Sequence, residues 1–385
     1  MRIASRGEGV AADGRHAKLA APGDLLLADG TITAGPGRAL PPCRHFPVCG
    51  GCQLQHVSDT AYATYITGRI ISALNAQGID APQIDKAHVS PPRTRRRASM
   101  RAERRGKRII LGFNEAASNA IVDLSECHVM LPELFALLRP LRSLLIAMLP
   151  DNARAAIKLS RADQGVDLML GGFEVQGLHA IEILAAFGKA NSLARLSLDE
   201  GLGPSVRYAP GDVSVTLAGV PIALPEGAFL QATADGEAAL VKAVQSALTG
   251  AVEVADLFAG LGTFALALPG KVLAVEGARD AVLALIAARR VAVEHRDLFR
   301  RPLSVAELSR FDGVVLDPPR AGAKEQVAAL AKSAIPKIAY VSCNPATFAR
   351  DAKTLVDGGY RLERITPVGQ FRWSTHVELA AAFIR

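Results

Sequence analysis

The chain changes its pattern of apolar and polar positions after Pro225. Beyond this point, short apolar runs alternate with segments in which apolar residues recur at helical spacing. The runs predict strands at 252–258, 272–276, 291–295, 313–317, 338–342 and 361–368, with helices at 235–248, 263–268, 278–290, 324–333 and 345–356. Repeated β-α units indicate a doubly wound α/β sheet with right-handed crossovers. A last run, 377–384, predicts an antiparallel final strand.

The preceding part of the chain has a different texture. Strand-like runs at 108–113, 120–124, 155–160 and 165–170, together with an amphipathic helix at 132–148, predict an α+β domain. A helix at 59–77 is expected to end at Gly78 and could dock on the C-terminal domain. Residues 1–40 hold only short apolar stretches, too little for a barrel. We therefore predict three parts: 1–40, 41–225 and 226–385.

The charge of the chain is concentrated in one place. The net charge is +7, and between Arg93 and Arg108 the basic residues are interrupted by one acid, Glu103. This run is either a solvated pair of charged strands or a surface that follows a phosphate backbone. The sequence shows no membrane span and no secretory signal, so we expect a cytoplasmic protein. It implies no protein partner.

Four of the five cysteines have metal-ligand spacing. Cys43, Cys49 and Cys52 lie within ten residues and can face one point, while Cys127 must reach them through the fold. Disulfides are not expected in the cytoplasm. On spacing alone, a structural zinc ion and an iron–sulfur cluster both remain open.

A second pattern points to a nucleoside-type cofactor. The turn Asp256-Leu257-Phe258-Ala259-Gly260-Leu261-Gly262 follows a predicted strand and precedes a helix. Glu276 ends the next strand, where an acid can bind ribose hydroxyls. Ala265 stands where a nicotinamide site would have a third glycine, so S-adenosylmethionine is favoured.

The fifth cysteine is the strongest candidate for chemistry. Cys343 ends the strand 338–342, and Asp317, in Asp317-Pro318-Pro319-Arg320, ends the strand before it, so both should face one crevice. The alternative for Cys343 is a small buried hydrophobe. Glu378 begins the last strand at the same edge. It could be a general base or an ordinary edge-strand charge.

Together with Phe229-Leu230-Gln231, Ser342-Cys343-Asn344-Pro345 and His376-Val377-Glu378, these motifs resemble the S-adenosylmethionine-dependent RNA uracil-5-methyltransferase family, which acts on tRNA and large-subunit rRNA. The resemblance extends from about residue 41 to the C-terminus. It implies a Rossmann-like class I methyltransferase domain and RNA as the partner. The N-terminal segment resembles only a truncated form of the family's RNA-binding TRAM barrel. Thr233 and Thr263 replace asparagines that are common in the family, which implies altered cofactor contacts.

The resemblance also implies a role for individual residues. Cys343 would be the nucleophile that adds to uracil C6, and Glu378 would accept the C5 proton. The positions that match the family's cofactor-binding residues are Gln231, Phe258, Glu276 and Asp317. The positions that match ligands of a [4Fe–4S] cluster are Cys43, Cys49, Cys52 and Cys127.

Two alternatives belong to other classes. An RNA cytosine-C5 methyltransferase would use a similar thiol adduct, but such enzymes usually carry a second cysteine in a proline-cysteine motif, where this chain has Arg320 after its proline pair. A non-catalytic RNA-binding iron–sulfur protein would not need the complete set of candidate site residues.

Overall fold

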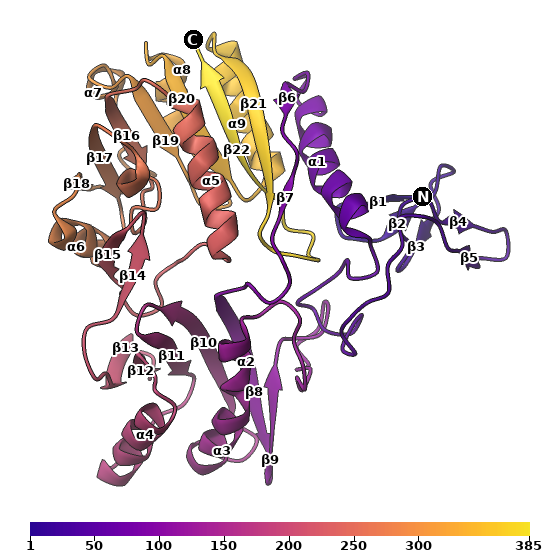
Figure 1. The fold of residues 1–385 in the computed structure, drawn as a ribbon, viewed down its shortest axis with the longest axis vertical. Coiled ribbons are helices and arrows are strands. Elements are labelled where there is room, and N and C mark those ends of the chain that lie inside the picture. The colour runs from indigo at the N-terminus through magenta and orange to yellow at the C-terminus, as the bar shows by residue number, and fades with distance from the viewer.

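The computed structural model describes residues 1–385. A nine-stranded sheet forms the C-terminal part, a six-stranded sheet forms the central part, and the N-terminal segment lies to one side (Figure 1). No helix combines the length and the apolar character needed to cross a bilayer.

The predicted doubly wound α/β sheet is confirmed. Its strand order is β18-β17-β16-β19-β20-β22-β21-β6, with β7 also paired to β21. The strands from the C-terminal part are β16 (Glu253–Leu257), β17 (Lys271–Glu276), β18 (Ala292–His295), β19 (Gly313–Leu316), β20 (Lys337–Ser342), β21 (Arg361–Gly369) and β22 (Glu378–Ile384). The last strand, β22, is antiparallel to both neighbours, β20 and β21.

Alternate residues of these strands enter two different cores. Leu257, Leu316 and Tyr340 face a cluster that includes α1 (Asp59–Asn75), α8 (Lys324–Ala331) and α9 (Pro345–Asp357). Val254 and Val315 face the opposite cluster, with α5 (Ala234–Ala247) and α6 (Arg279–Ala288). Because both faces are covered, the central strands β16, β17, β19 and β20 are mostly apolar.

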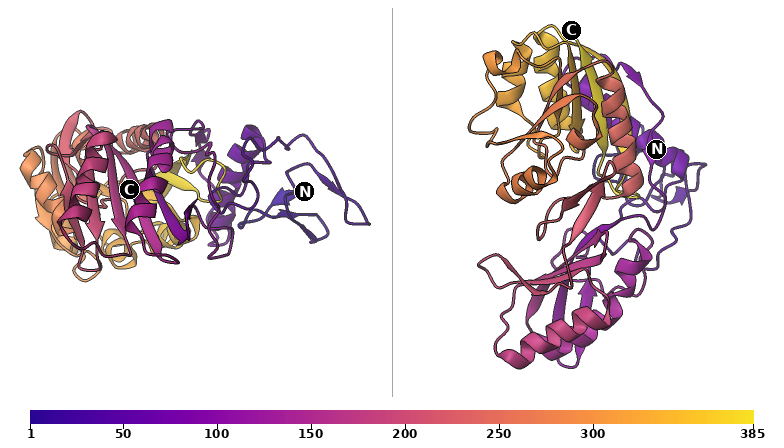
Figure 2. Two further views of the ribbon diagram at one scale, coloured as in Figure 1. Left: turned by 90° about the horizontal axis from the view of Figure 1, so that it is seen from below. Right: turned by 60° about the vertical axis from the view of Figure 1, so that its left-hand side comes forward.

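The central sheet has the order β13-β12-β11-β10-β8-β9. Its strands are β8 (Arg97–Arg105), β9 (Arg108–Gly112), β10 (Arg154–Ala162), β11 (Gly165–Gly171), β12 (Arg195–Asp199) and β13 (Pro204–Tyr208). The helices α3 (Leu138–Met148) and α4 (Leu178–Ala190) cover one face (Figure 2). The hairpin of β14 (Ser214–Leu217) and β15 (Val220–Ala223) packs against α6 and so links the two large sheets.

The segment 59–89 precedes the central sheet in the chain but packs on the nine-stranded sheet. Helix α1 contacts α9 and β21, while β6 (Gln83–Ile84) and β7 (His88–Val89) pair with β21. The first forty residues form two small sheets. They contain β1 (Arg2–Ile3), β2 (Gly9–Val10) and β3 (His16–Ala17), then β4 (Leu25–Leu26) and β5 (Ile32–Thr33).

Some predicted elements differ from the structure. The helix expected at 132–148 is divided into α2 (Pro132–Ala136) and α3, because the ring of Pro140 is incompatible with a helical carbonyl four residues earlier, at Ala136. The strand expected at 120–124 is reduced to an isolated bridge, Asn114 to Ile121. The helix expected at 263–268 is a 3₁₀ turn, η1 (Ala265–Ala267). The remaining short helix is α7 (Val305–Leu308).

Candidate active site

The carboxyl ends of β16, β17, β19, β20 and β21 meet at one edge of the nine-stranded sheet, and β22 begins there. Cys343 follows β20, and Glu378 is the first residue of β22. Ser342, the last residue of β20, pairs with Leu379 of β22, so Cys343 and Glu378 each stand one residue beyond this last pair of the ladder. The topology therefore brings together the two residues predicted to carry the chemistry.

Glu378 lies in a strongly desolvated environment. Its side chain is 5% exposed, and burial, followed by the charge of Asp317, raises its pKa from 4.5 to about 8. A hydrogen bond from Gln370 and the charge of Arg97 act in the opposite direction. A carboxyl with a pKa near the working pH is suited to exchange protons.

Cys343 is half-buried and makes no disulfide. Burial raises the pKa of its thiol, and the charges of Glu378 and Asp317 raise it further, while Arg320 lowers it. The thiolate form of Cys343 is therefore scarce at neutral pH.

The glycine turn lies beside this pair. Glu276 accepts hydrogen bonds from the backbone N–H of Gly260 at 2.8 Å and from that of Ala278 at 2.7 Å. Each carboxylate oxygen keeps a further lone pair for a ligand. Gly262 has φ +87°, and a Cβ there would lie 2.7 Å from Leu285 Cδ2, so no other residue fits without strain.

Phe258, Asp317 and Asp256 complete the edge. Phe258 adopts φ +64°, a conformation that is uncommon for a non-glycine residue, and its ring lies 5.3 Å from that of Phe299. Burial and the charge of Glu276 raise the pKa of Asp317 to about 7. Asp256 is fully buried, and its Oδ1 has no hydrogen-bond partner, whereas Oδ2 accepts from Ala265 N at 2.8 Å.

Gln231 reaches the same edge from the loop before α5. It is buried, and its carbonyl accepts a hydrogen bond at 2.9 Å from Nε of Arg96, which also forms an ion pair with Glu237. Arg96 thus fixes the Gln231 loop to the central sheet. Thr233, whose replacement of an asparagine implies altered cofactor contacts, caps α5 by accepting a hydrogen bond from Gly236 N at 3.1 Å and is 1% exposed.

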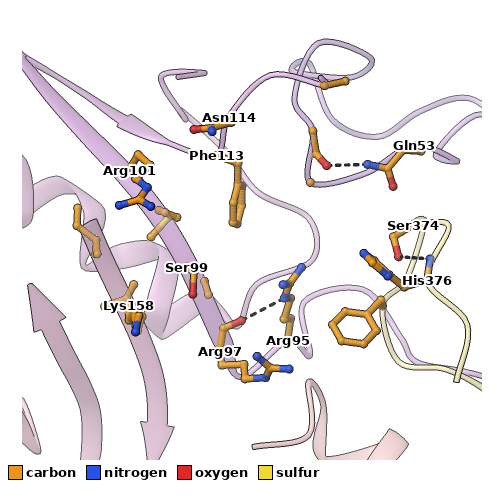
Figure 3. Close-up of a pocket in the computed structure, with 18 of the residues that line it drawn as sticks. Gln53, Arg95, Arg97, Ser99, Arg101, Phe113, Asn114, Lys158, Ser374 and His376 are labelled. Atoms are coloured by element: carbon orange, nitrogen blue, oxygen red, sulfur yellow. Dashed lines mark hydrogen bonds between the residues drawn. The ribbon is translucent and has the colours of Figure 1, made fainter. Parts of the chain in front are cut away.

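A crevice of about 960 Å³ opens next to this edge, between the central sheet, the 50–53 loop and the 371–376 loop (Figure 3). Arg95, Arg97, Arg101 and Lys158 line it, and Glu115 is the only acidic residue in its wall. Arg97 lies 4.4 Å above the ring of Phe229, which is 62% exposed. Phe229 and His376, which also line the crevice, lie two residues from Gln231 and Glu378 in the chain, so the crevice adjoins the strand edge.

The arginines of the basic run 93–108 have two kinds of surroundings: some have no protein partner, and others bind groups of the protein. Arg101 has no hydrogen-bond or ion-pair partner and projects into the crevice, as does Lys158 of the neighbouring strand β10 (Figure 3). Arg104 instead donates to the carbonyls of Ile146 and Leu149 at the end of α3, at 2.8 and 2.6 Å. Arg108 pairs with Asp123. Only part of the run is therefore available to a polyanion.

Comparison with known proteins identifies the family. The model of the tRNA (uracil-5-)-methyltransferase family matches residues 287–385. A Zymomonas mobilis protein described as an uncharacterized RNA methyltransferase is 48% identical over 100% of this chain and 99% of its own length. The 23S rRNA (uracil(1939)-C(5))-methyltransferase RlmD of Edwardsiella ictaluri is 33% identical, covering 91% of this chain and 83% of its own.

The chain belongs to the S-adenosylmethionine-dependent RNA uracil-5-methyltransferase family. It is an RNA methyltransferase enzyme. The fold agrees with that of the Pyrococcus abyssi tRNA (uracil-54, C5)-methyltransferase in complex with S-adenosyl-L-homocysteine. That structure has a TM-score of 0.74 and 21% identity, covering 100% of this chain and 98% of the other.

The structure of this RNA uracil-5-methyltransferase does not show the metal site that was predicted at four of its cysteines. No group of three or more histidine, cysteine, aspartate or glutamate side chains is placed to hold a metal ion. The four cysteines nevertheless line one small cavity, of about 20 Å³, together with apolar side chains. All four are free thiols. Burial raises the pKa of Cys43, Cys49 and Cys52, the last to about 12.

One polar residue of the site was missed by sequence reasoning. Gln370 follows β21 and contacts both Gln231 and Glu378. The only sequence feature that could have indicated it is a glutamine directly after a strand whose carboxyl end lies at the same edge of the sheet as Cys343.

Proposed function

We propose that the enzyme methylates C5 of a uridine in structured rRNA or tRNA through a covalent bond between Cys343 and C6 of the uracil. The opposition of one thiol and one buried carboxyl beside the glycine turn carries this proposal. Uracil C5 is a weak nucleophile toward a sulfonium methyl group. Its methylation therefore requires a thiol that activates the ring, a methyl donor and a base in one place.

The proposed reaction regenerates the enzyme in three steps. The Cys343 thiolate forms a bond to C6, and the electrons of the C5–C6 double bond move to O4 as an enolate. C5 then attacks the donor methyl carbon, so the carbon–sulfur bond breaks and leaves S-adenosylhomocysteine. Glu378 removes the C5 proton, the C–H electrons restore the C5–C6 double bond, and the thiolate leaves C6.

Residues of the strand edge would hold the methyl donor. Glu276 has lone pairs for ribose hydroxyls, Phe258 offers an aromatic face, and Gln231 and Asp317 border the thiol side. S-adenosylmethionine supplies the electrophilic methyl group when it is bound. The buried acids favour a donor that carries a positive charge, since burial and the charge of Glu276 raise the pKa of Asp317, and burial and the charges of Asp317 and Glu276 raise that of Asp256.

The crevice is proposed to hold the RNA. A uridine in a folded RNA must leave its stack to enter such a site. The unpaired cations Arg101 and Lys158 can contact the phosphate backbone, because phosphate contacts supply most of the affinity of such interfaces. The exposed ring of Phe229 gives a stacking surface at the inner end.

We further propose that Cys43, Cys49, Cys52 and Cys127 bind a [4Fe–4S] cluster. Their thiols line one cavity walled by Phe46, Phe113, Leu124 and Val129, and such a set of soft donors suits iron–sulfur binding. The donor set supports the proposal. A cluster there would be structural, because Cys127 ties a distant segment to the 43–52 loop.

Nucleoside mass spectrometry of separated tRNA and large-subunit rRNA from a strain lacking this gene tests the proposal. We expect 5-methyluridine to disappear at one site of one RNA pool and to return with the wild-type gene but not with Cys343→Ala. Loss of 5-methylcytidine instead, or full complementation by Cys343→Ala, would overturn the proposal.

A further inference from the structure

The side-chain amide of Gln370 lies at the centre of the candidate site. It is 1% exposed and follows β21, whose carboxyl end is next to the start of β22. Its Nε2 donates one hydrogen bond to Gln231 Oε1, at 2.7 Å, and another to Glu378 Oε2. One amide group therefore contacts both a predicted donor-binding residue and the predicted base.

The orientation of this amide is determined by its surroundings. Gln370 Oε1 accepts a hydrogen bond from the backbone N–H of Ala232 at 2.7 Å, so the nitrogen must face the other two residues. The side chain is also confined at its base, because a Cβ on Gly236 of α5 would lie 2.7 Å from Gln370 Cβ. The amide cannot rotate without losing these contacts.

This orientation has consequences for both neighbours. The bond to Gln231 occupies that residue's Oε1, so its Nε2, which has no protein partner, is available to donate to a ligand. The bond to Glu378 occupies Oε2, so Oε1 is left as the oxygen that can accept a proton from the substrate.

We propose that Gln370 is a positioning residue that aligns Glu378 for removal of the C5 proton and holds Gln231 toward the methyl donor. This inference rests on the proposed function, since it assigns Gln370 a role through the base. A misplacement of the base by about 1 Å can reduce the rate on the order of 100-fold. Loss of the amide should therefore slow release of the methylated RNA more than methyl transfer itself.

The test uses Gln370→Met, Glu378→Gln, the double variant and a matched control, Gln326→Met. Gln326 is also 1% exposed, and its amide bonds to both backbone groups of Leu303, far from the site. The substrate is the RNA pool from the gene-deletion strain. Methyl incorporation, covalent protein–RNA adduct on denaturing gels and S-adenosylmethionine affinity are measured for each protein.

We expect Gln370→Met to accumulate the methylated adduct, with turnover reduced about 10- to 100-fold and weaker binding of S-adenosylmethionine. When Glu378→Gln is already present, Gln370→Met should have no further effect on turnover, but it should still weaken binding of S-adenosylmethionine. Gln326→Met should accumulate no adduct, even if it lowers the melting temperature. An additive effect in the double variant, or normal release by Gln370→Met, would overturn the inference.

The pH profile gives a second readout. Charged groups around Glu378 are Asp317, Arg97 and Cys343, and these stay in place in Gln370→Met. The hydrogen bond from Gln370 lowers the pKa of Glu378, so its loss should raise this pKa. The pH at which the rate of product release increases should then be about one unit higher. An unchanged profile would count against positioning. If instead Glu378→Gln forms no adduct, or Cys343→Ala remains active, the proposed function itself fails, and the inference fails with it.

Discussion

At the scale of single residues, the site concentrates buried acids whose pKa values are raised. Glu378 and Asp317 have pKa values near 8 and 7, and that of Asp256 lies well above its usual range. Burying carboxyl groups close together costs stability wherever they ionise. The arrangement therefore serves the site at the expense of the fold.

The stability of Glu378→Gln should reveal this cost. The pKa of Glu378 is about 8 in the folded protein, against 4.5 for an ordinary glutamate. The folded state thus retains a proton that the unfolded chain releases, so the contribution to stability is full below pH 4.5 and is lost as the pH rises through 8. At pH 9, the free energy of unfolding of Glu378→Gln should exceed that of the wild type by about 5 kcal/mol, because the pKa shift corresponds to about 1.4 kcal/mol per unit. Denaturation at pH 5 and 9 checks this, and equal stabilities at pH 9 would contradict it.

The same pKa values predict the pH dependence of activity. In the proposed reaction Cys343 attacks as a thiolate and Glu378 accepts a proton in its ionised form, while the pKa of each is raised. Methylation under subsaturating RNA should therefore increase steadily from pH 6.5 to pH 9. A maximum at or below pH 7 would show that other groups control the reaction.

At the scale of elements, two arginines of strand β8 have different surroundings and therefore different expected roles. Arg101 faces the crevice without a partner, whereas Arg104 binds carbonyls at the end of α3. Arg101→Ala should weaken RNA binding and leave the melting temperature unchanged. The slope of the logarithm of the RNA binding constant against the logarithm of salt concentration should become about one unit less steep. Arg104→Met should destabilise the protein by about 1–3 kcal/mol. Arg108→Ala, whose side chain pairs with Asp123, is the control for charge alone. A reversal of the two effects would refute the division.

The cysteine loop makes a separate prediction at this scale. Cys127→Ser should lose iron and sulfide and lower the melting temperature, because it frees the 43–52 loop from the distant segment. S-adenosylmethionine affinity should be unchanged. Cys343→Ser should keep its iron, as that thiol is not in the cavity. Normal stability of an iron-free Cys127→Ser protein would contradict a structural role.

At the scale of the whole molecule, much of the C-terminal sheet could be predicted from the sequence. Its central strands are mostly apolar and are separated by helical segments, so the ends of these strands, and with them Cys343, Asp317 and Glu276, can be located. Contacts between distant segments were beyond such reasoning. Neither Gln370 nor the pairing of β6 and β7 with β21 follows from local periodicity, because both depend on partners that lie far away in the chain.

The crevice is likewise a property of the assembled molecule. Its walls come from the N-terminal loop, the central sheet and the 371–376 loop, and the basic run alone did not show which arginines would face it. Arg96 joins the central sheet to the Gln231 loop, so one side chain connects the proposed RNA-binding crevice with the proposed methyl-donor site.

Peptide mass spectrometry of the adduct formed by Glu378→Gln tests the central claim most directly. The purified variant is incubated with S-adenosylmethionine and RNA from the gene-deletion strain, then digested with nuclease and protease. We predict a 5-methyluridine nucleotide attached to the peptide that contains Cys343, and none in the Cys343→Ala, Glu378→Gln double variant. Formation of 5-methyluridine by the wild type, with no adduct at Cys343 in the variant, would contradict the account.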